Sequence, residues 1–131
     1  MSDALLDRLP YARFLGLRTL AAGDELTVVM PFADRLIGNP MIPALHGGST
    51  AALLEMTAIA QVALWQPQAR LPRPINVTVA YLRSGRPGDV YARARINRAG
   101  RRVAHVLAEA WQEERDQPIA SLNAHFLLDG D

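Results

Sequence analysis

The longest apolar segment of the chain lies between residues 45 and 65 and predicts a buried helix. Its sequence is LHGGSTAALLEMTAIAQVALW, in which Glu55 is the only acidic or basic residue apart from a histidine at the start. A helix that is apolar almost all round is buried in a protein. The residues three and four positions before and after Glu55 are alanine or isoleucine, so the helix itself offers this carboxylate no cation. An unpaired carboxylate in an apolar setting destabilises a fold, which makes Glu55 a candidate for chemistry.

Alternating apolar and polar residues follow this helix and predict strands. Residues 75–82 alternate, with one face made of Ile75, Val77, Val79 and Tyr81. Three further alternating segments lie at 90–97, 101–111 and 119–128. Turn sequences separate the four segments, at 84–89, 99–100 and 113–118. Because successive strands with short connections pair antiparallel, the sequence predicts an antiparallel sheet.

The residues before the helix predict shorter elements. Residues 3–9 predict a short helix that Pro10 ends, followed by an extended stretch. Residues 22–24, Ala-Gly-Asp, predict a turn. Residues 25–31 predict a strand whose alternate residues share one apolar face, namely Leu26, Val28 and Met30. Residues 32–45 contain one glycine and two prolines and predict irregular structure.

Together these elements predict an α+β protein that forms a single domain over residues 1–131. One apolar helix needs to be wrapped on several sides, and a twisted antiparallel sheet can do this. We therefore expect a long central helix wrapped by a curved antiparallel sheet of about five to six strands.

Composition narrows the function classes. The chain has 131 residues, is 50% apolar and has a net charge of +1, so no strong attraction to nucleic acid or to an acidic membrane is expected. It has no cysteine, which excludes disulfides and thiol catalysis and fits a cytoplasmic location. We see no signal peptide and no segment long enough to span a membrane. The three histidines are not spaced for a metal site, and no metal or separate cofactor is expected.

Two glycines at the start of the helix suggest a second reactive group. Gly47 and Gly48 lie where backbone N–H groups have no intrahelical acceptor and the helix dipole is positive. Glycine also lets a substrate oxygen approach these groups closely. A carbonyl-polarising turn and a buried carboxylate on one element suggest acyl transfer or hydrolysis.

The distance between these groups predicts an oligomer. Gly47 and Glu55 are eight residues apart, which is roughly 12 Å of helical rise. One acyl carbon cannot contact both groups of the same chain. A two-fold dimer with antiparallel helices would place each Gly47 near the partner's Glu55. The alternative is that Glu55 lies at a solvated edge of the helix or pairs with an arginine from another element.

These residues resemble the hotdog-fold acyl-CoA thioesterases of the phenylacetyl-CoA and 4-hydroxybenzoyl-CoA types. The motif HGGxxxxLxE runs from His46 to Glu55, and Asn39-Pro40 precedes it. The segments VTVAYLR at 77–83 and RAGRR at 98–102 also match. The resemblance covers roughly residues 14–128 and implies a homodimer, often paired into a dimer of dimers, that hydrolyses an acyl-CoA thioester.

The resemblance also implies roles for individual residues. The Gly47 N–H would polarise the thioester carbonyl, and Glu55 of the partner subunit would attack that carbonyl or activate water. His46 would shape the turn, and Asn39 would help to hold the carbonyl or the water. Substrate would also contact Gly48, Ile59 and Tyr81. Coenzyme A would be held by turn residues, namely Arg83, Ser84, Arg86, Arg98, Gly100, Arg101 and Arg102.

The sequence departs from this family at two places. Asn39 lies seven residues before His46 instead of six, and a one-residue bulge at 41–44 could restore its position. No hydroxyl occupies residues 73–75, and Ile59 stands where one branch of the family has threonine. These departures leave a non-catalytic acyl-CoA binding module as one alternative. A second alternative is an acyl-thioester hydratase or dehydratase that uses His46 with Glu55.

The acyl group itself is not specified by the sequence. The pocket is expected to be lined by aliphatic residues of the segments around the helix, among them Met41, Ile42, Ile59, Val62 and Ala63. Such a lining accepts either a medium-length chain or an aromatic ring, because apolar pockets discriminate weakly between them.

Overall fold

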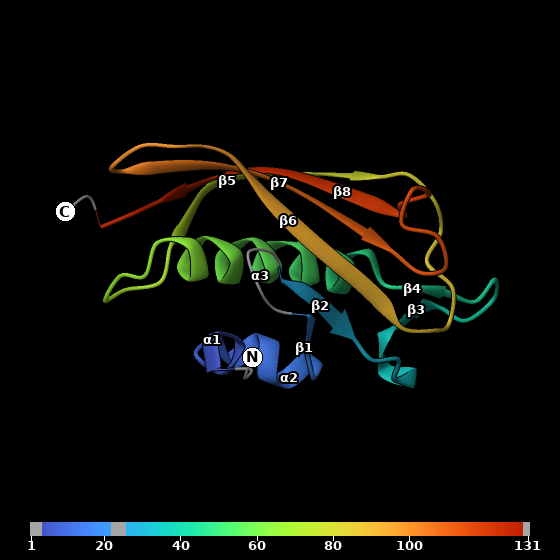
Figure 1. Cartoon of the computed structure of the whole chain (residues 1–131). Helices are drawn as coiled ribbons and strands as arrows, with labels where there is room; N and C mark the ends of the chain where they lie inside the picture. Colours follow the sequence, from blue (N-terminus) through green and yellow to red (C-terminus); the bar gives the residue numbers. More distant parts are fainter. Residues whose placement is uncertain (1–3, 22–25, 130–131) are drawn as a thin grey trace.

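One long helix lies across the inner face of a six-stranded antiparallel sheet (Figure 1). The computed structural model describes residues 4–21 and 26–129. The central helix is α3 (Gly47–Trp65), as the sequence predicts. The sheet has the order β1-β2-β6-β7-β8-β5. Its strands are β1 (Arg18–Ala21), β2 (Thr27–Met30), β5 (Arg73–Tyr81), β6 (Val90–Ala99), β7 (Val103–Trp111) and β8 (Ala120–Leu127).

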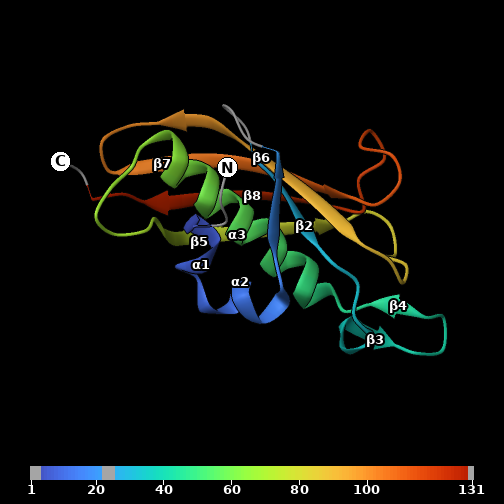
Figure 2. The same ribbon diagram turned by 60° about the horizontal axis from the view of Figure 1, so that its bottom comes forward.

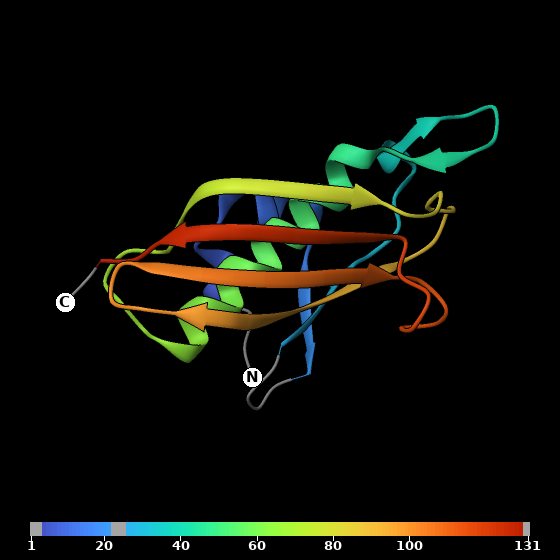
Figure 3. The same cartoon turned by 90° about the horizontal axis from the view of Figure 1, so that it is seen from above.

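The sheet buries one face of β6, β7 and β8 against α3, whereas the edge strand β5 has no fully buried residue. Strands β6, β7 and β8 form an antiparallel meander (Figure 3). Their inward residues are mostly small or β-branched and completely buried, for example Ala92, Val106 and Ala124. Small side chains let the helix approach the sheet closely, and Phe126 fills the largest space beneath it. In β2, the predicted apolar face of Leu26, Val28 and Met30 is buried and is thereby confirmed.

The pairing of β5 differs from the sequence prediction. Consecutive pairing would place β5 beside β6, but β5 pairs with β8 at the edge of the sheet. Both edges of β6 are already occupied, by β2 and β7, and β5 instead pairs with the outer edge of β8. Residues 84–89 therefore form a crossover and not a hairpin turn. The backbone N–H groups of Leu82 and Arg83 both donate to the carbonyl of Ile119, which starts this crossover at the β8 end.

The N-terminal part also differs from its prediction. Pro10 does not end a helix but begins one, because proline is well suited to the first position of a helix. The chain forms α1 (Ala4–Asp7) and then α2 (Pro10–Leu15), and Gly16 ends α2 in the left-handed conformation. Both helices lie on the side of α3 that faces away from the sheet (Figure 2). The predicted turn at 22–24 lies outside the described residues.

Residues 32–45 contain more regular structure than predicted. A 3-10 helix, η1 (Asp34–Leu36), leads into a short hairpin of β3 (Ile37–Asn39) and β4 (Ala44–Leu45). The hairpin extends beyond the sheet at the end where α3 begins (Figures 1 and 3). Its tip leaves Met41 88% and Ile42 64% exposed, which makes it an apolar projection.

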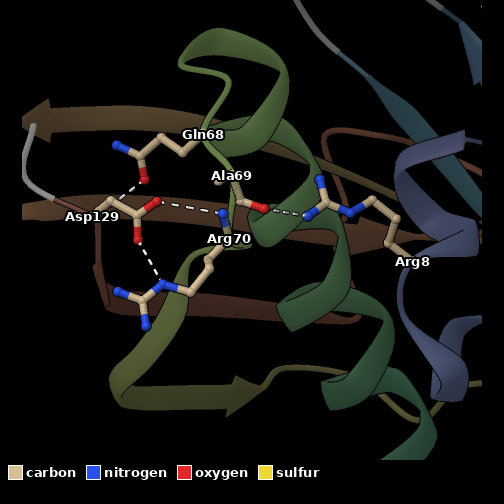
Figure 4. A network of polar contacts seen from close by, with 5 residues as sticks. All are labelled: Arg8, Gln68, Ala69, Arg70 and Asp129. Atoms are coloured by element: carbon tan, nitrogen blue, oxygen red, sulfur yellow. Dashed lines mark hydrogen bonds and ion pairs between the residues drawn. The ribbon is translucent and has the colours of Figure 1, made fainter.

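A polar network joins three distant segments at the other end of α3 (Figure 4). Asp129, after β8, accepts from the Nε of Arg70 at 3.1 Å and donates its own N–H to Gln68 at 2.9 Å. Arg8, after α1, donates to the carbonyl of Ala69 at 3.0 Å. The loop between α3 and β5 is thus tied to both α1 and the last strand.

This arrangement confirms the predicted α+β class and is the hotdog fold: a long helix wrapped by a curved antiparallel sheet. No helix within residues 4–21 and 26–129 is long and apolar enough to cross a bilayer.

Candidate active site at the start of the central helix

His46 caps α3 and fixes the shape of the turn. Its Nδ1 accepts a hydrogen bond from the N–H of Gly48 at 2.8 Å. Its carbonyl accepts from both the N–H and the hydroxyl of Ser49, at 3.1 and 2.7 Å. Because Nδ1 is an acceptor here, the neutral ring carries its proton on Nε2. His46 therefore stabilises the turn through its Nδ1 and its carbonyl, and its Nε2 is a hydrogen-bond donor.

Gly47 leaves a backbone donor unused. As the first residue of α3 its N–H has no intrahelical acceptor, and it donates to no described residue. Its carbonyl accepts from the hydroxyl of Tyr81 at 2.9 Å. A Cβ at this position would lie 3.1 Å from the Tyr81 ring, so glycine allows the close approach. The turn thus presents one oriented N–H at the positive end of the helix.

A cavity of about 380 Å³ has Gly47 in its lining, together with the polar side chains of Tyr81, Arg83 and Ser84. We name it the polar cavity; its lining is Ala44, Leu45, Gly47, Thr50, Tyr81, Leu82, Arg83, Ser84, Gly85, Ile119 and Ala120. Tyr81, Arg83 and Ser84 were predicted to contact substrate, and the structure brings these three together with Gly47. The side chain of Arg83 is held by a hydrogen bond to the carbonyl of Pro118 at 2.8 Å.

Thr50 is a candidate that sequence reasoning missed. It lies one turn after Gly47 on the same side of α3 and lines the polar cavity, although the residue as a whole is buried. Its hydroxyl makes no hydrogen bond to any described residue. The i, i+3 spacing from Gly47 was the available signal, because residues so spaced share a helix face. Thr57 is different, because its hydroxyl donates to the carbonyl of Leu53 inside the core.

Glu55 is half-buried on α3 and makes no ion pair or hydrogen bond with any described residue. Its neighbours on the same partly covered stripe of the helix are Ala51, Ala52 and Met56. The alternative of an arginine partner from another element is thus not realised within residues 4–21 and 26–129. Glu55 does not line the polar cavity of its own chain. The helical rise of roughly 12 Å keeps it away from Gly47.

The predicted coenzyme A residues fall into two groups. Arg86 lies on the crossover that also carries Arg83 and Ser84, and its backbone is fixed by two hydrogen bonds with the side chain of Gln112. The second group lies on the β6–β7 hairpin and comprises Arg98, Gly100, Arg101 and Arg102. Its position is set by the bond from Leu128 N–H to the Arg102 carbonyl at 2.7 Å. That bond is at the end of β8 away from the polar cavity, and the length of β8 separates the two by roughly 24 Å. Within one chain, the arginines of the crossover and those of the β6–β7 hairpin are therefore far apart.

Asn39 is occupied as a loop cap. Its Oδ1 accepts from the N–H of Met41 at 3.0 Å, and its side chain is exposed on the hairpin. The irregular pairing of this hairpin falls between Ile37 and Asn39 and not at 41–44. Gly38 forms the irregularity and packs so closely on His46 that a Cβ would lie 2.9 Å from its Cα. Asn39 is not among the residues that line the polar cavity of its own chain.

Several residues expected around the acyl group do not line the polar cavity of their own chain. Ile59 is 5% exposed in the core, and Val62 and Ala63 are buried with it. Met41 and Ile42 are at the exposed hairpin tip. Gly48 flanks Gly47, and its N–H is taken by His46.

The other two histidines are satisfied on the outer face of the sheet. His105 bonds to Asn97 and Asn123 at 2.9 and 2.7 Å, and His125 bonds to Asn76 at 3.0 Å. The two rings stack, with centroids 4.6 Å apart. Within the part of the chain that the structure describes, no group of three or more potential ligands could hold a metal ion.

The hotdog fold and this turn define the class of protein, a thioesterase-like hotdog protein. Residues 38–127 match the family model described as the acyl-CoA thioesterase N-terminal domain, and the chain belongs to this family. The matched region contains the turn, all of α3, and β5 to β8. No curated protein matches the chain.

Solved structures agree with this assignment. A protein from Chromobacterium violaceum is 36% identical with a TM-score of 0.74, over 95% of this chain and 86% of that one. A protein from Pseudomonas aeruginosa is 28% identical with a TM-score of 0.84, over 95% and 94%. A protein from Shewanella oneidensis related to the thioesterase superfamily is 25% identical with a TM-score of 0.80, over 96% and 91%.

Proposed function

We propose that the chain hydrolyses an acyl-CoA thioester to a free acid and coenzyme A at a site shared between two subunits. Gly47 N–H of one subunit polarises the carbonyl, and Glu55 of the partner subunit acts on the carbonyl carbon. One observation carries the proposal. Helix α3 holds two groups without a partner among the described residues, the Gly47 N–H and the Glu55 carboxylate, and they are too far apart to act on the same carbonyl group. Membership of the acyl-CoA thioesterase family supports the same chemistry.

A second copy of the chain can supply the missing half of the site. Among the described strands β5 pairs only with β8, so its other edge is open. Open strand edges are templates for pairing with another chain. Near this edge the exposed apolar side chains include Ile75, Tyr81 and Leu82, and the hairpin tip adds Met41 and Ile42. A two-fold axis beside β5 would make the two α3 helices antiparallel and bring Gly47 and Glu55 of different subunits together.

The chemistry has two routes that the geometry serves equally. In one, the Glu55 carboxylate attacks the carbonyl carbon, the C–S bond breaks and coenzyme A leaves as the thiolate. Water then hydrolyses the mixed anhydride, which releases the acid, regenerates the Glu55 carboxylate and supplies the proton of the thiol. In the other, Glu55 removes a proton from water, whose oxygen attacks the carbonyl directly, and the proton ends on the departing thiolate. In both routes negative charge develops on the carbonyl oxygen, where Gly47 N–H stabilises it. The guanidinium of Arg83 suits the phosphates of coenzyme A.

The state of His46 argues against a hydratase or dehydratase that uses this ring as its base. A general base needs a free lone pair, but Nδ1 already accepts from Gly48 and the neutral ring is protonated on Nε2. The other ring nitrogen, Nε2, can only donate in this arrangement. Incubation with an enoyl-CoA separates the two activities, since loss of the conjugated absorbance without release of thiol would favour hydration.

The deciding experiment measures free thiol released from a panel of acyl-CoA thioesters. Glu55→Gln keeps the size of the side chain and removes its charge, and we expect turnover to fall by about 10²-fold or more. Glu113→Gln, in the exposed β7–β8 loop, is the matched control and should retain activity. Unchanged turnover in Glu55→Gln would refute the assignment. Tight acyl-CoA binding with no thiol release in the unmodified protein would instead identify a binding module.

A further inference from the structure

A second cavity contacts the same turn. It has a volume of about 340 Å³, and its lining is Tyr11, Phe14, Leu15, Arg35, Leu36, His46, Gly48 and Ser49. We name it the aromatic cavity. The polar cavity meets the turn through Gly47 and Thr50, whereas the aromatic cavity meets it through His46, Gly48 and Ser49. Gly47 thus lines the polar cavity, and its two chain neighbours, His46 and Gly48, line the aromatic cavity.

Two stacked rings form a fixed wall of the aromatic cavity. Tyr11 and Phe14 lie one turn apart on α2, with centroids 5.8 Å apart and planes within 9°. They are 46% and 60% exposed, which is high for aromatic side chains. Their helix is not loosely attached, because Ala12 and Leu15 on the same helix are buried in the core. The wall is thus a firmly attached aromatic surface that remains largely exposed in the described part of the chain.

Arg35 adds a cation to this wall without a counter-ion. Its Nη2 donates to the Phe14 carbonyl at 2.6 Å, and its guanidinium carbon lies 4.9 Å from the centre of the Phe14 ring. These two contacts fix the position of the charge. Its remaining N–H groups bond to no described residue, and the ion pair found within residues 4–21 and 26–129 is the distant Arg70–Asp129. Since the lining holds no acid, the cavity presents one uncompensated positive charge to an occupant.

We propose that the aromatic cavity holds the acyl group and that Arg35 makes the enzyme prefer acyl groups that end in a carboxylate. The proposal rests on the thioesterase function proposed above. With the carbonyl at Gly47 N–H and coenzyme A in the polar cavity, the acyl chain lies along the Tyr11–Phe14 wall. Its terminal carboxylate then accepts charge-assisted hydrogen bonds from Arg35. Tyr11, Phe14 and Arg35 are specificity-determining residues and take no part in bond breaking.

The test compares two acyl groups of equal length, hexanoyl-CoA and adipoyl-CoA, which differ in the terminal carboxylate. The unmodified enzyme should show the higher kcat/KM for adipoyl-CoA. Arg35→Gln should lower kcat/KM for adipoyl-CoA about tenfold and leave hexanoyl-CoA within about twofold, as expected for a hydrogen bond to a charged group. Arg13→Gln, an exposed arginine on α2 outside the cavity lining, is the matched control and should change neither value.

A second variant tests the wall. Phe14→Ala should raise KM for both six-carbon substrates and leave acetyl-CoA unaffected, because an acetyl group is too short to reach the wall. Trp65→Ala removes an aromatic residue of similar exposure at the far end of α3 and serves as the control. Light scattering on Phe14→Ala should show an unchanged mass; a loss of oligomer would show that the wall is an interface and would overturn the proposal.

The remaining outcomes separate this inference from the proposed function. An equal loss for both substrates in Arg35→Gln would show that the guanidinium contacts a phosphate of coenzyme A, and would overturn the proposal. Thiol release with no preference for adipoyl-CoA would also overturn it while leaving the thioesterase function intact. No release from any acyl-CoA by the unmodified protein would refute both.

Discussion

The hydroxyl of Tyr81 donates a hydrogen bond to the carbonyl of Gly47 at 2.9 Å, which joins the last residue of β5 to the first residue of α3. The bond connects the edge of the sheet to the turn that presents the free N–H. The same ring lies against the glycine so closely that a Cβ would be 3.1 Å away. The position of the proposed oxyanion donor thus depends on a side chain from a strand far along the chain.

Loss of this bond should weaken catalysis without removing it. We expect Tyr81→Phe to lower kcat/KM about fivefold, the equivalent of one net hydrogen bond. Tyr91→Phe is the control, since that ring stacks on Trp111 away from the turn. Thiol-release kinetics measure both variants, and equal rates for Tyr81→Phe and the unmodified enzyme would contradict the role of the bond.

Removal of the Gly47 N–H should have a larger effect. Proline has no N–H and is tolerated at the first position of a helix, and His46 before it already has the extended conformation that proline requires. Gly47→Pro should lower kcat by about 10²–10³-fold, as for loss of an oxyanion-hole donor. Gly47→Ala adds the same Cβ against Tyr81 but keeps the N–H, so the difference between the two variants isolates the donor. Similar activities of the two variants would show that the loss comes from contact of the new Cβ with the Tyr81 ring and not from loss of the N–H.

A shared site predicts complementation between two inactive variants. In a mixed dimer of Glu55→Gln and Gly47→Pro subunits, one site carries both defects and the other carries neither. One of the two sites of each mixed dimer is then intact, so the purified mixed dimer should have about half of the unmodified activity. Co-expression with two affinity tags and a thiol-release assay measure this recovery. If the purified mixed dimer stayed inactive, both groups would belong to one subunit or the site would have another composition.

The hydroxyl of Thr50 should matter and that of Thr57 should not. Both threonines are buried on α3, but Thr50 lines the polar cavity whereas Thr57 bonds to the Leu53 carbonyl. We expect Thr50→Val to lower kcat/KM about tenfold with little loss of stability. Thr57→Val is the matched change within the core and should leave kinetics unaltered. The reverse pattern would remove Thr50 from the site.

Stability should depend on the core far more than on the surface ion pair of Figure 4. Arg70 is 65% exposed, so Asp129→Ala should cost about 1 kcal/mol or less. Phe126 is completely buried, and Phe126→Ala should cost about 3–5 kcal/mol. Urea unfolding followed by circular dichroism gives both values. A larger loss for Asp129→Ala would mean that the network is cooperative with the core.

Local patterns in the sequence predicted α3 and the four long strands well. The helix from Gly47 to Trp65 could be read from its apolar run, and the alternation at 103–111 matches the buried face of β7. The prediction that Pro10 ends a helix is wrong, because proline is equally compatible with the first position of a helix and Pro10 begins α2. The HGG turn also predicted where an unused N–H lies, since the first N–H of any helix lacks an acceptor.

The sequence by itself determined which segments are helix or strand and that Glu55 has no partner on its own helix, because these properties depend on residues within one or two turns. The tertiary structure alone decided that β5 pairs with β8, that Tyr81 bonds to Gly47, and that Tyr11, Phe14 and Arg35 meet His46 at one cavity. These contacts join residues far apart in the chain. They depend on which strand edges remain open and on how the elements pack. The spacing of apolar residues within one helix or strand does not determine either of these.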